Sequence, residues 1–145
     1  QQAVIDFDHT PDALTNVMQA VNESAENIAL VFGCGGDRDR SKRPLMAQAA
    51  LNSKATVWLT DDNPRTENNE PIFSDVLSCA GAEQFFREHD RSRAIQLACE
   101  SDAELIVIAG KGHENYQDIA GVKQPYSDEA VLLQLGFEKA GGHDA

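Results

Sequence analysis

Three apolar runs in the chain predict buried strands. They lie at residues 28–32, 56–59 and 105–109, and each is four or five residues long. A run without polar alternation is typical of a strand that is covered on both faces, as in a parallel sheet. A shorter run at 3–5, directly before Asp6, predicts a further strand that leads into a polar loop.

Segments with helical spacing of apolar residues alternate with these strands. In the first, Thr10 is a good N-cap, Pro11 suits the first helical position, and apolar residues recur from Leu14 to Val21. The other expected elements are a helix begun at Pro44 or slightly earlier, a helix opened by Pro71, a weak strand at 83–86, a helix entered from 90–92, a hairpin around Gly121 and a helix from Ser127 to about Leu135.

This alternation predicts an α/β fold for residues 1–145. We expect a Rossmann-like three-layer sandwich, in which a mostly parallel sheet carries helices on both faces. No linker, repeat or low-complexity stretch divides the chain, and 145 residues suit a single domain. The tail at 141–145 is expected to fray.

Composition narrows the classes of partner. The chain has 24 acidic and 12 basic residues, a formal net charge of −12, which argues against a nucleic-acid or anionic-membrane surface. No apolar run reaches membrane-spanning length and no signal-peptide pattern opens the chain, so we expect a cytoplasmic, monomeric protein. Three widely spaced cysteines without a CxxC pattern indicate packing rather than disulfides or a metal site.

Four unusual polar segments follow the predicted strands, at 6–12, 33–43, 61–65 and 110–114. In open parallel sheets, ligands bind beyond the carboxyl ends of the strands, which is where these segments should meet. A single polar loop would carry little meaning. Four of them at one edge predict a ligand site.

The segment at 33–43 suits an anion, and the segment at 61–65 suits an amino acid, which offers an ammonium and a carboxylate group together. The glycines at 33–36 allow close approach of a ligand, and Arg38 after them offers the planar fork that binds a carboxylate. Segment 61–65 combines carboxylates, an amide and the guanidinium of Arg65. The alternatives are a tight turn before a solvated helix start and an Asx-type turn with an exposed arginine.

The remaining two segments are open to two interpretations each. Glu114 and the backbone carbonyls of 110–114 suit an ammonium group, but the segment also resembles a flexible Gly-rich turn. Asp6 and His9 either hold a ribose or phosphate or merely cap the first helix. The residues alone leave both pairs of alternatives open.

Taken together, the polar segments resemble the MurE family of Mur ligases over nearly the whole chain. The motifs that carry the resemblance are DFDHTPDAL at 6–14, GCGGDRD at 33–39, KRPLM at 42–46, DDNPRTE at 61–67, GKGHE at 110–114 followed by Tyr116 and Gln117, and YSD at 126–128. Two departures occur: Phe7–Asp8 replaces the usual Tyr–Ala, and Glu129 stands where the family commonly has Arg.

The resemblance implies the last of three domains of an ATP-dependent ligase. Such a ligase adds meso-diaminopimelate to UDP-MurNAc-L-Ala-D-Glu during peptidoglycan precursor synthesis. The chain has no GxxxxGK[ST] segment, so ATP and Mg²⁺ are expected to be held mainly by a central domain outside it, and the chain alone is expected to be inactive. Two alternatives are a ligase that adds another amino acid, such as lysine, and a free-standing amino-acid-binding module.

The resemblance also assigns roles to individual residues, although it implies no catalytic or metal-binding residue in this chain. The intact DNPR at 62–65 is the pattern of the diaminopimelate-adding members, as opposed to the lysine-adding ones. The residues implied to surround meso-diaminopimelate are Arg38, Asp62, Asn63, Arg65, Gly110 and Glu114, and those implied to face the ribose and adenine of ATP are Asp6 and His9.

Overall fold

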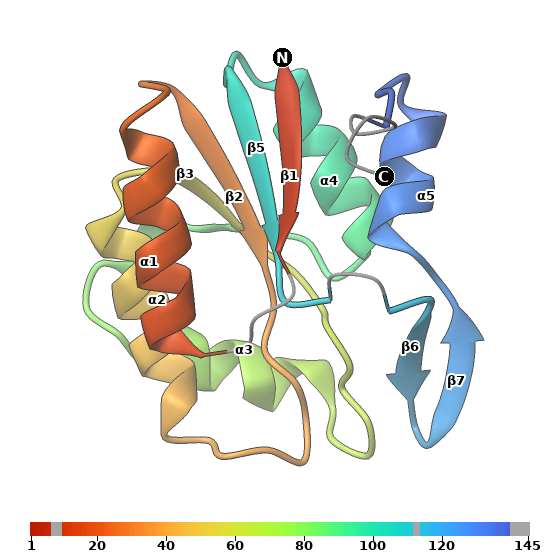
Figure 1. Cartoon of the computed structure of the whole chain (residues 1–145). Coiled ribbons are helices and arrows are strands. Elements are labelled where there is room, and N and C mark those ends of the chain that lie inside the picture. Colours follow the sequence, from red (N-terminus) through yellow and green to blue (C-terminus); the bar gives the residue numbers. More distant parts are fainter. Residues whose placement is uncertain (7–9, 112–113, 140–145) are drawn as a thin grey trace.

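Five parallel strands form the sheet at the centre of the structure, a computed structural model that describes residues 1–6, 10–111 and 114–139 (Figure 1). All neighbouring strands pair in parallel, so all of them end at the same edge of the sheet. In the order β1-β5-β2-β3-β4, the strands are β1 (Gln2–Asp6), β5 (Leu105–Ala109), β2 (Ile28–Phe32), β3 (Thr56–Leu59) and β4 (Phe86–Arg87).

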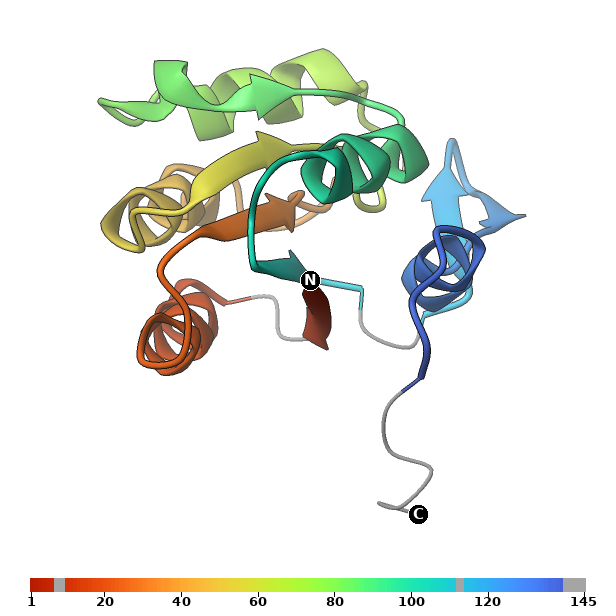
Figure 2. The same ribbon diagram turned by 90° about the horizontal axis from the view of Figure 1, so that it is seen from above.

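Helices cover both faces of this sheet, as Figure 2 shows from above. The helices α1 (Pro11–Asn22), α2 (Lys42–Asn52) and α3 (Asn69–Leu77) lie on one face. The helices α4 (Arg91–Glu100) and α5 (Asp128–Gln134) lie on the other. The predicted Rossmann-like three-layer sandwich is therefore confirmed.

Strand β2 shows why its sequence is apolar throughout. Its alternate residues Leu30 and Phe32 pack into one core, against α1, α2 and α3, while Ala29 and Val31 pack into a second core, against α4. Successive side chains of a strand point to opposite faces, so a strand between two helical layers has no face left for polar residues. Strand β5 follows the same alternation.

A two-stranded antiparallel hairpin of β6 (Tyr116–Ile119) and β7 (Val122–Pro125) lies beside the carboxyl edge of the sheet (Figure 1). Both turn residues, Ala120 and Gly121, have positive φ, at 55° and 81°. Two successive positive φ values define a type I′ turn, whose twist matches that of a tight hairpin. The hairpin predicted around Gly121 is confirmed.

The weak strand predicted at 83–86 is wrong in most of its length. A 3-10 turn occupies Ala82–Gln84, and only Phe86 belongs to a strand, the two-residue β4. The reason lies in the adjacent aromatic residues. Phe85 is buried against Phe32 in the core, whereas Phe86 stacks on Trp58 at the sheet edge, so the polar residues before them curl into a turn.

The remaining predicted elements occur, with small shifts at helix starts. Helix α2 begins two residues before Pro44 and α3 two residues before Pro71. Proline is tolerated there because the amides of the first helical turn have no partner within the helix. No described helix is long and apolar enough to cross a bilayer. The predicted fraying of 141–145 concerns residues outside the described ones.

Candidate functional site

A cavity of about 410 Å³ opens at the carboxyl edge of the sheet. The loops after β2, β3 and β5 all contribute to it, together with Thr10 at the start of α1. The structure thus brings together segments that are far apart in the sequence. The lining includes every residue implied to bind the amino acid: Arg38, Asp62, Asn63, Arg65, Gly110 and Glu114.

The two residues implied to face ATP are placed differently. Asp6 is the last residue of β1, and its carbonyl accepts a hydrogen bond from the amide of Gly110 at 2.9 Å. It therefore lies at the same edge of the sheet, although it is not among the described residues that line the cavity. His9 and the Phe7–Asp8 departure lie outside the described residues. The roles of Asp6 and His9 toward ATP stay predictions.

Arg65 is held by its backbone and by one nitrogen of its guanidinium. Its amide donates to the carbonyl of Asp118 at 2.8 Å, and its carbonyl accepts from the amide of Ala120 at 2.7 Å, so the hairpin holds it in place. These bonds offset a left-handed backbone conformation, with φ at 54°. The Nη1 atom donates to the carbonyls of Gly36 and Asn63. Within the described residues, Nε and Nη2 make no hydrogen bond.

Lys111 joins three of the predicted ligand-binding residues below the cavity. Its side chain is fully buried, and its Nζ lies 2.8 Å from Asn63 Oδ1, 3.0 Å from Glu114 Oε1 and 3.2 Å from Asp62 Oδ1. Asn63 also donates from Nδ2 to Glu114 Oε1 at 3.2 Å. This role is not predictable from the sequence, because a lysine between two glycines is typical of a solvated turn.

Half of the basic stretch after the glycines is neutralised within the protein. Arg43 is buried and pairs with Glu67 at 2.7 Å and with Asp75 at 2.8 Å. Arg40 pairs with Asp75 as well, and hydrogen bonds from Arg40 and Arg43 lower the pKa of Asp75 to about 2. Of the four basic residues of this stretch, Arg38 and Lys42 therefore carry most of the positive charge at the cavity, and both line it.

Asp61, in the loop after β3, binds His89 and is not among the described residues that line the cavity. Its Oδ1 lies 2.8 Å from Nδ1 of His89, whose Nε2 lies 3.0 Å from Glu70. The imidazole also stacks on the ring of Phe73, with 4.1 Å between centroids. Partial burial lowers the pKa of His89, but the hydrogen bonds to Asp61 and Glu70 outweigh it, so the pKa is raised. This arrangement ties the loop to α3.

The glycines at 33–36 are needed because two loops touch there. A Cβ added at Gly36 would collide with the carbonyl of Pro64, and one at Gly33 with the carbonyl of Thr60. The amide of Gly36 also donates to the carbonyl of Asn63 at 2.7 Å. Close contact between the loops after β2 and β3 thus depends on residues without side chains.

We expect Gly36→Ala to lower the free energy of unfolding by about 2–3 kcal/mol, because backbone atoms must move apart. Gly35→Ala is the matched variant: its Cβ would meet Nη1 of Arg65 at 2.6 Å, the end of a flexible side chain, so its cost in stability should be small. Urea unfolding of the two variants measures the difference. Equal losses of stability in both would contradict the loop contact as the cause.

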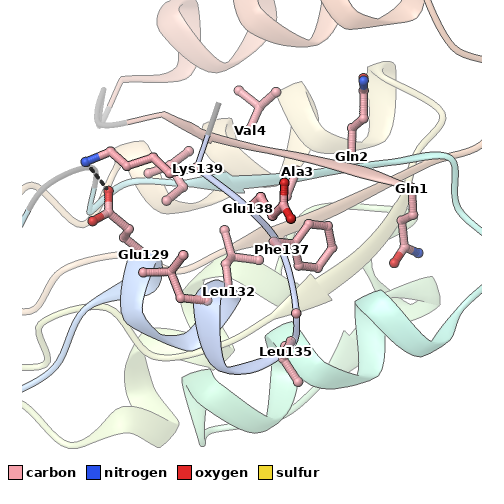
Figure 3. A pocket seen from close by; sticks show the side chains of 13 residues that line it. Gln1, Gln2, Ala3, Val4, Glu129, Leu132, Leu135, Phe137, Glu138 and Lys139 are labelled. Atoms are coloured by element: carbon pink, nitrogen blue, oxygen red, sulfur yellow. Dashed lines mark ion pairs between the residues drawn. The ribbon is translucent and has the colours of Figure 1, made fainter. Parts of the chain in front are cut away.

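A larger cavity, of about 780 Å³, lies alongside β1 and away from the polar loops (Figure 3). Its walls are the edge strand and the segment from α5 onward, with Val4, Leu132 and Phe137 among the apolar lining. Glu129, one of the departures from the family pattern, lies here and pairs with Lys139 at 3.5 Å, and nothing in the structure explains the exchange for arginine. The convergence of charged groups makes the smaller cavity the candidate site.

The chain matches the family model described as "Mur ligase, glutamate ligase domain" over residues 1–112. It is 48% identical over 130 residues to a UDP-N-acetylmuramoyl-L-alanyl-D-glutamate–2,6-diaminopimelate ligase of Ectopseudomonas mendocina, covering 86% of the chain and 26% of that protein. The ligase of the same name from Neisseria meningitidis serogroup A is 48% identical over 136 residues, which cover 90% of the chain and 27% of that protein.

A solved structure of a ligase with this name superposes on the chain with a TM-score of 0.85 and 46% identity. The match covers 92% of this chain and 28% of that one. The chain thus spans about a quarter of the length of the curated relatives it matches.

Proposed function

The chain belongs to the Mur ligase family through its glutamate ligase domain, and on this premise we propose that it is the amino-acid-binding domain of a diaminopimelate-adding ligase. The complete enzyme joins meso-diaminopimelate to UDP-MurNAc-L-Ala-D-Glu with ATP, in the cytoplasmic synthesis of bacterial peptidoglycan precursors. We propose further that residues 1–145 act as a single domain in a monomeric enzyme, without nucleic-acid or membrane partners.

The observation that carries the proposal is one cavity that contains acidic, amide and guanidinium groups from three loops. Diaminopimelate has an amino-acid head at each end, so it needs acceptors for ammonium groups and donors for carboxylates. Glu114 and Asp62 supply the acceptors, whereas Asn63 Nδ2 and the guanidinium groups supply donors. A cavity with only one sign of charge would suit either the ammonium groups or the carboxylates of this substrate, but not both.

Arg65 is the residue that we propose to select diaminopimelate over lysine. The two molecules differ by one distal carboxylate, which a guanidinium fork binds through two parallel hydrogen bonds. Free lysine bound in the cavity would leave the guanidinium donors without a partner. A site built to hydrogen-bond one substrate group rejects a substrate that lacks this group strongly. Arg38 lines the same cavity and is proposed to assist.

The domain's share of the reaction is to hold the amino acid and present its amine to an acyl phosphate made on the D-Glu carboxyl group. Correct placement of a nucleophile contributes much of the rate in such reactions. ATP and Mg²⁺ are proposed to bind mainly in the central domain, with Asp6 and His9 at the edge of the ATP site. The chain has no GxxxxGK[ST] segment, which supports placing the phosphate-binding loop in the central domain.

A direct test is the ATP-dependent ligation of radiolabelled meso-diaminopimelate by the complete ligase that contains this chain. We expect incorporation of diaminopimelate and little of lysine, and no release of ADP by the 145-residue chain alone. Preference for lysine would favour a related ligase with another specificity. Absence of ligation with either amino acid, combined with tight binding of one of them by the chain in calorimetry, would favour a free-standing binding module.

A further inference from the structure

The side chain of Lys111 is buried beneath the candidate site, and it is not among the residues that line the cavity. Its partners Asp62, Asn63 and Glu114 all do line it. A buried ammonium is costly unless it is paired, and here it is paired with three groups that are each proposed to touch the substrate. Lys111 Nζ also lies 5.7 Å from the ring of Tyr116, a further lining residue, so any effect of Lys111 on a ligand must pass through the side chains around it.

The first such effect concerns the orientation of the Asn63 amide. Its Oδ1 accepts from Lys111 Nζ at 2.8 Å and from the amide of Asp118 at 3.0 Å. With two donors on the oxygen, Nδ2 is directed to Glu114. A flipped amide would place its NH₂ group against an ammonium and an N–H, with no acceptor on that side. Lys111 thus keeps a donor pointing toward the carboxylate of Glu114 and the cavity.

The second effect concerns charge. Two carboxylates, Asp62 and Glu114, lie within 3.2 Å of one ammonium, which leaves the three groups together with one negative charge. Without Lys111, the two carboxylates would repel each other and the local charge would double.

We propose that Lys111 is a positioning residue for the amino-acid substrate: it fixes the Asn63 amide and holds Glu114 where the two together bind one amino-acid head. The inference rests on the proposed function. It adds a residue that touches no ligand but sets the affinity for diaminopimelate.

The test is Lys111→Met in the complete ligase. We expect the KM for meso-diaminopimelate to rise on the order of ten- to a hundredfold, as for the loss of a hydrogen bond to a charged group, while the KM for ATP stays within about twofold. Lys123→Met is the matched control. Like Lys111, Lys123 lies over the ring of Tyr116, with its Nζ 4.7 Å from the ring centroid, but it is an exposed residue of the hairpin strand β7. An unchanged KM for diaminopimelate in folded Lys111→Met overturns the inference.

A double-mutant cycle separates positioning from simple structural support. If Lys111 acts through Glu114, the combined effect of Lys111→Met and Glu114→Gln on this KM will be at least fivefold smaller than the product of the single effects. Multiplicative effects overturn the inference. The double variant removes the Glu114 charge together with the ammonium, so it leaves one carboxylate fewer without its cation and also serves if Lys111→Met fails to fold. Its KM for diaminopimelate should then match that of Glu114→Gln, and a further rise overturns the inference.

Wild-type activity distinguishes this inference from the proposed function. If the wild-type ligase does not use diaminopimelate, the proposed function fails, and the same cycle is scored with the amino acid it does use. If the wild type uses diaminopimelate but the Lys111 variants bind it normally, only the inference about Lys111 fails.

Discussion

Replacing Arg91 with methionine is expected to lower the free energy of unfolding of the chain by about 3–5 kcal/mol, the range found when one partner of a buried ion pair is removed. Arg91 and Asp128 are both fully buried and form two parallel hydrogen bonds, Nε to Oδ1 at 2.8 Å and Nη2 to Oδ2 at 2.9 Å. Methionine fills similar space but leaves the Asp128 carboxylate without its cation. Thermal unfolding should show a loss on the order of 10 °C or more.

The same guanidinium also connects the loops that form the site. It donates to the carbonyl of Asp61 after β3 and to the carbonyl of Ala109 at the end of β5, both at 3.2 Å. Tyr126 reaches the pair from the other side, donating to Asp128 at 2.6 Å. The start of α5 and two strand ends therefore share one buried cation. We expect the loss of Arg91 to disorder the site as well as to destabilise the fold.

Two further variants show whether the buried charge causes the loss. Arg93→Met changes an exposed arginine on the same helix, α4, and should change the stability by less than about 0.5 kcal/mol. Arg91→Met combined with Asp128→Leu removes both charges and should recover part of the lost stability. A thermal midpoint for Arg91→Met within two degrees of the wild type would contradict the role assigned to the pair.

The sequence predicted best those parts of the fold that depend on local patterns. Strands β2 and β5 are apolar at every position because both of their faces are covered, and no other element fits such short runs. The start of α1 was predictable from Thr10, whose hydroxyl accepts from the amide of Ala13. The convergence of the polar loops followed from parallel strands, since these all end at one edge.

The parts that the sequence did not predict depend on partners far along the chain. Arg91 was interpreted as part of a helix entry, and its partner Asp128 lies 37 residues later. Lys111 is similar, because its bonds to Asp62 and Asn63 span the distance between two strand ends. A charged residue without an obvious local partner is usually solvated. Composition and spacing therefore predict an exposed side chain at such positions, whereas Arg91 and Lys111 are buried.

The short strand β4 shows a different limit. Phe85 and Phe86 are equally apolar in sequence, but one enters the core and the other covers Trp58 at the edge of the sheet. Phe85 packs on Phe32 of β2 and Phe86 on Trp58 of β3, so contacts with distant residues, and not a local preference, distinguish the two. The contact of the hairpin with Arg65 is also not predictable from the sequence. Asp118 and Ala120 bind Arg65 through backbone atoms, which every residue type supplies.

The largest effect on function is expected from Arg65→Ala in the complete ligase. It should raise the KM for meso-diaminopimelate on the order of 10²–10³-fold, because a charge-assisted, two-pronged contact with the distal carboxylate is lost. The KM for ATP should stay within about twofold, and the preference for diaminopimelate over lysine should largely disappear. Arg65→Lys keeps the charge without the planar fork and should recover only part of the affinity.

Backbone contacts make Arg65 a clean position for this experiment. Its bonds to Asp118 and Ala120 use the main chain and persist in alanine, and its φ of 54° strains alanine and arginine alike. Alanine loses the Nη1 bonds to the carbonyls of Gly36 and Asn63, but the backbone bonds should keep the loop beside the hairpin, so a change in KM reports on the guanidinium. Arg40→Ala is the control, since Arg40 is an exposed arginine of the basic stretch at 38–43 that pairs with Asp75 and does not line the cavity. Equal rises in the KM values for diaminopimelate and ATP in Arg65→Ala would contradict a role in selecting the amino acid.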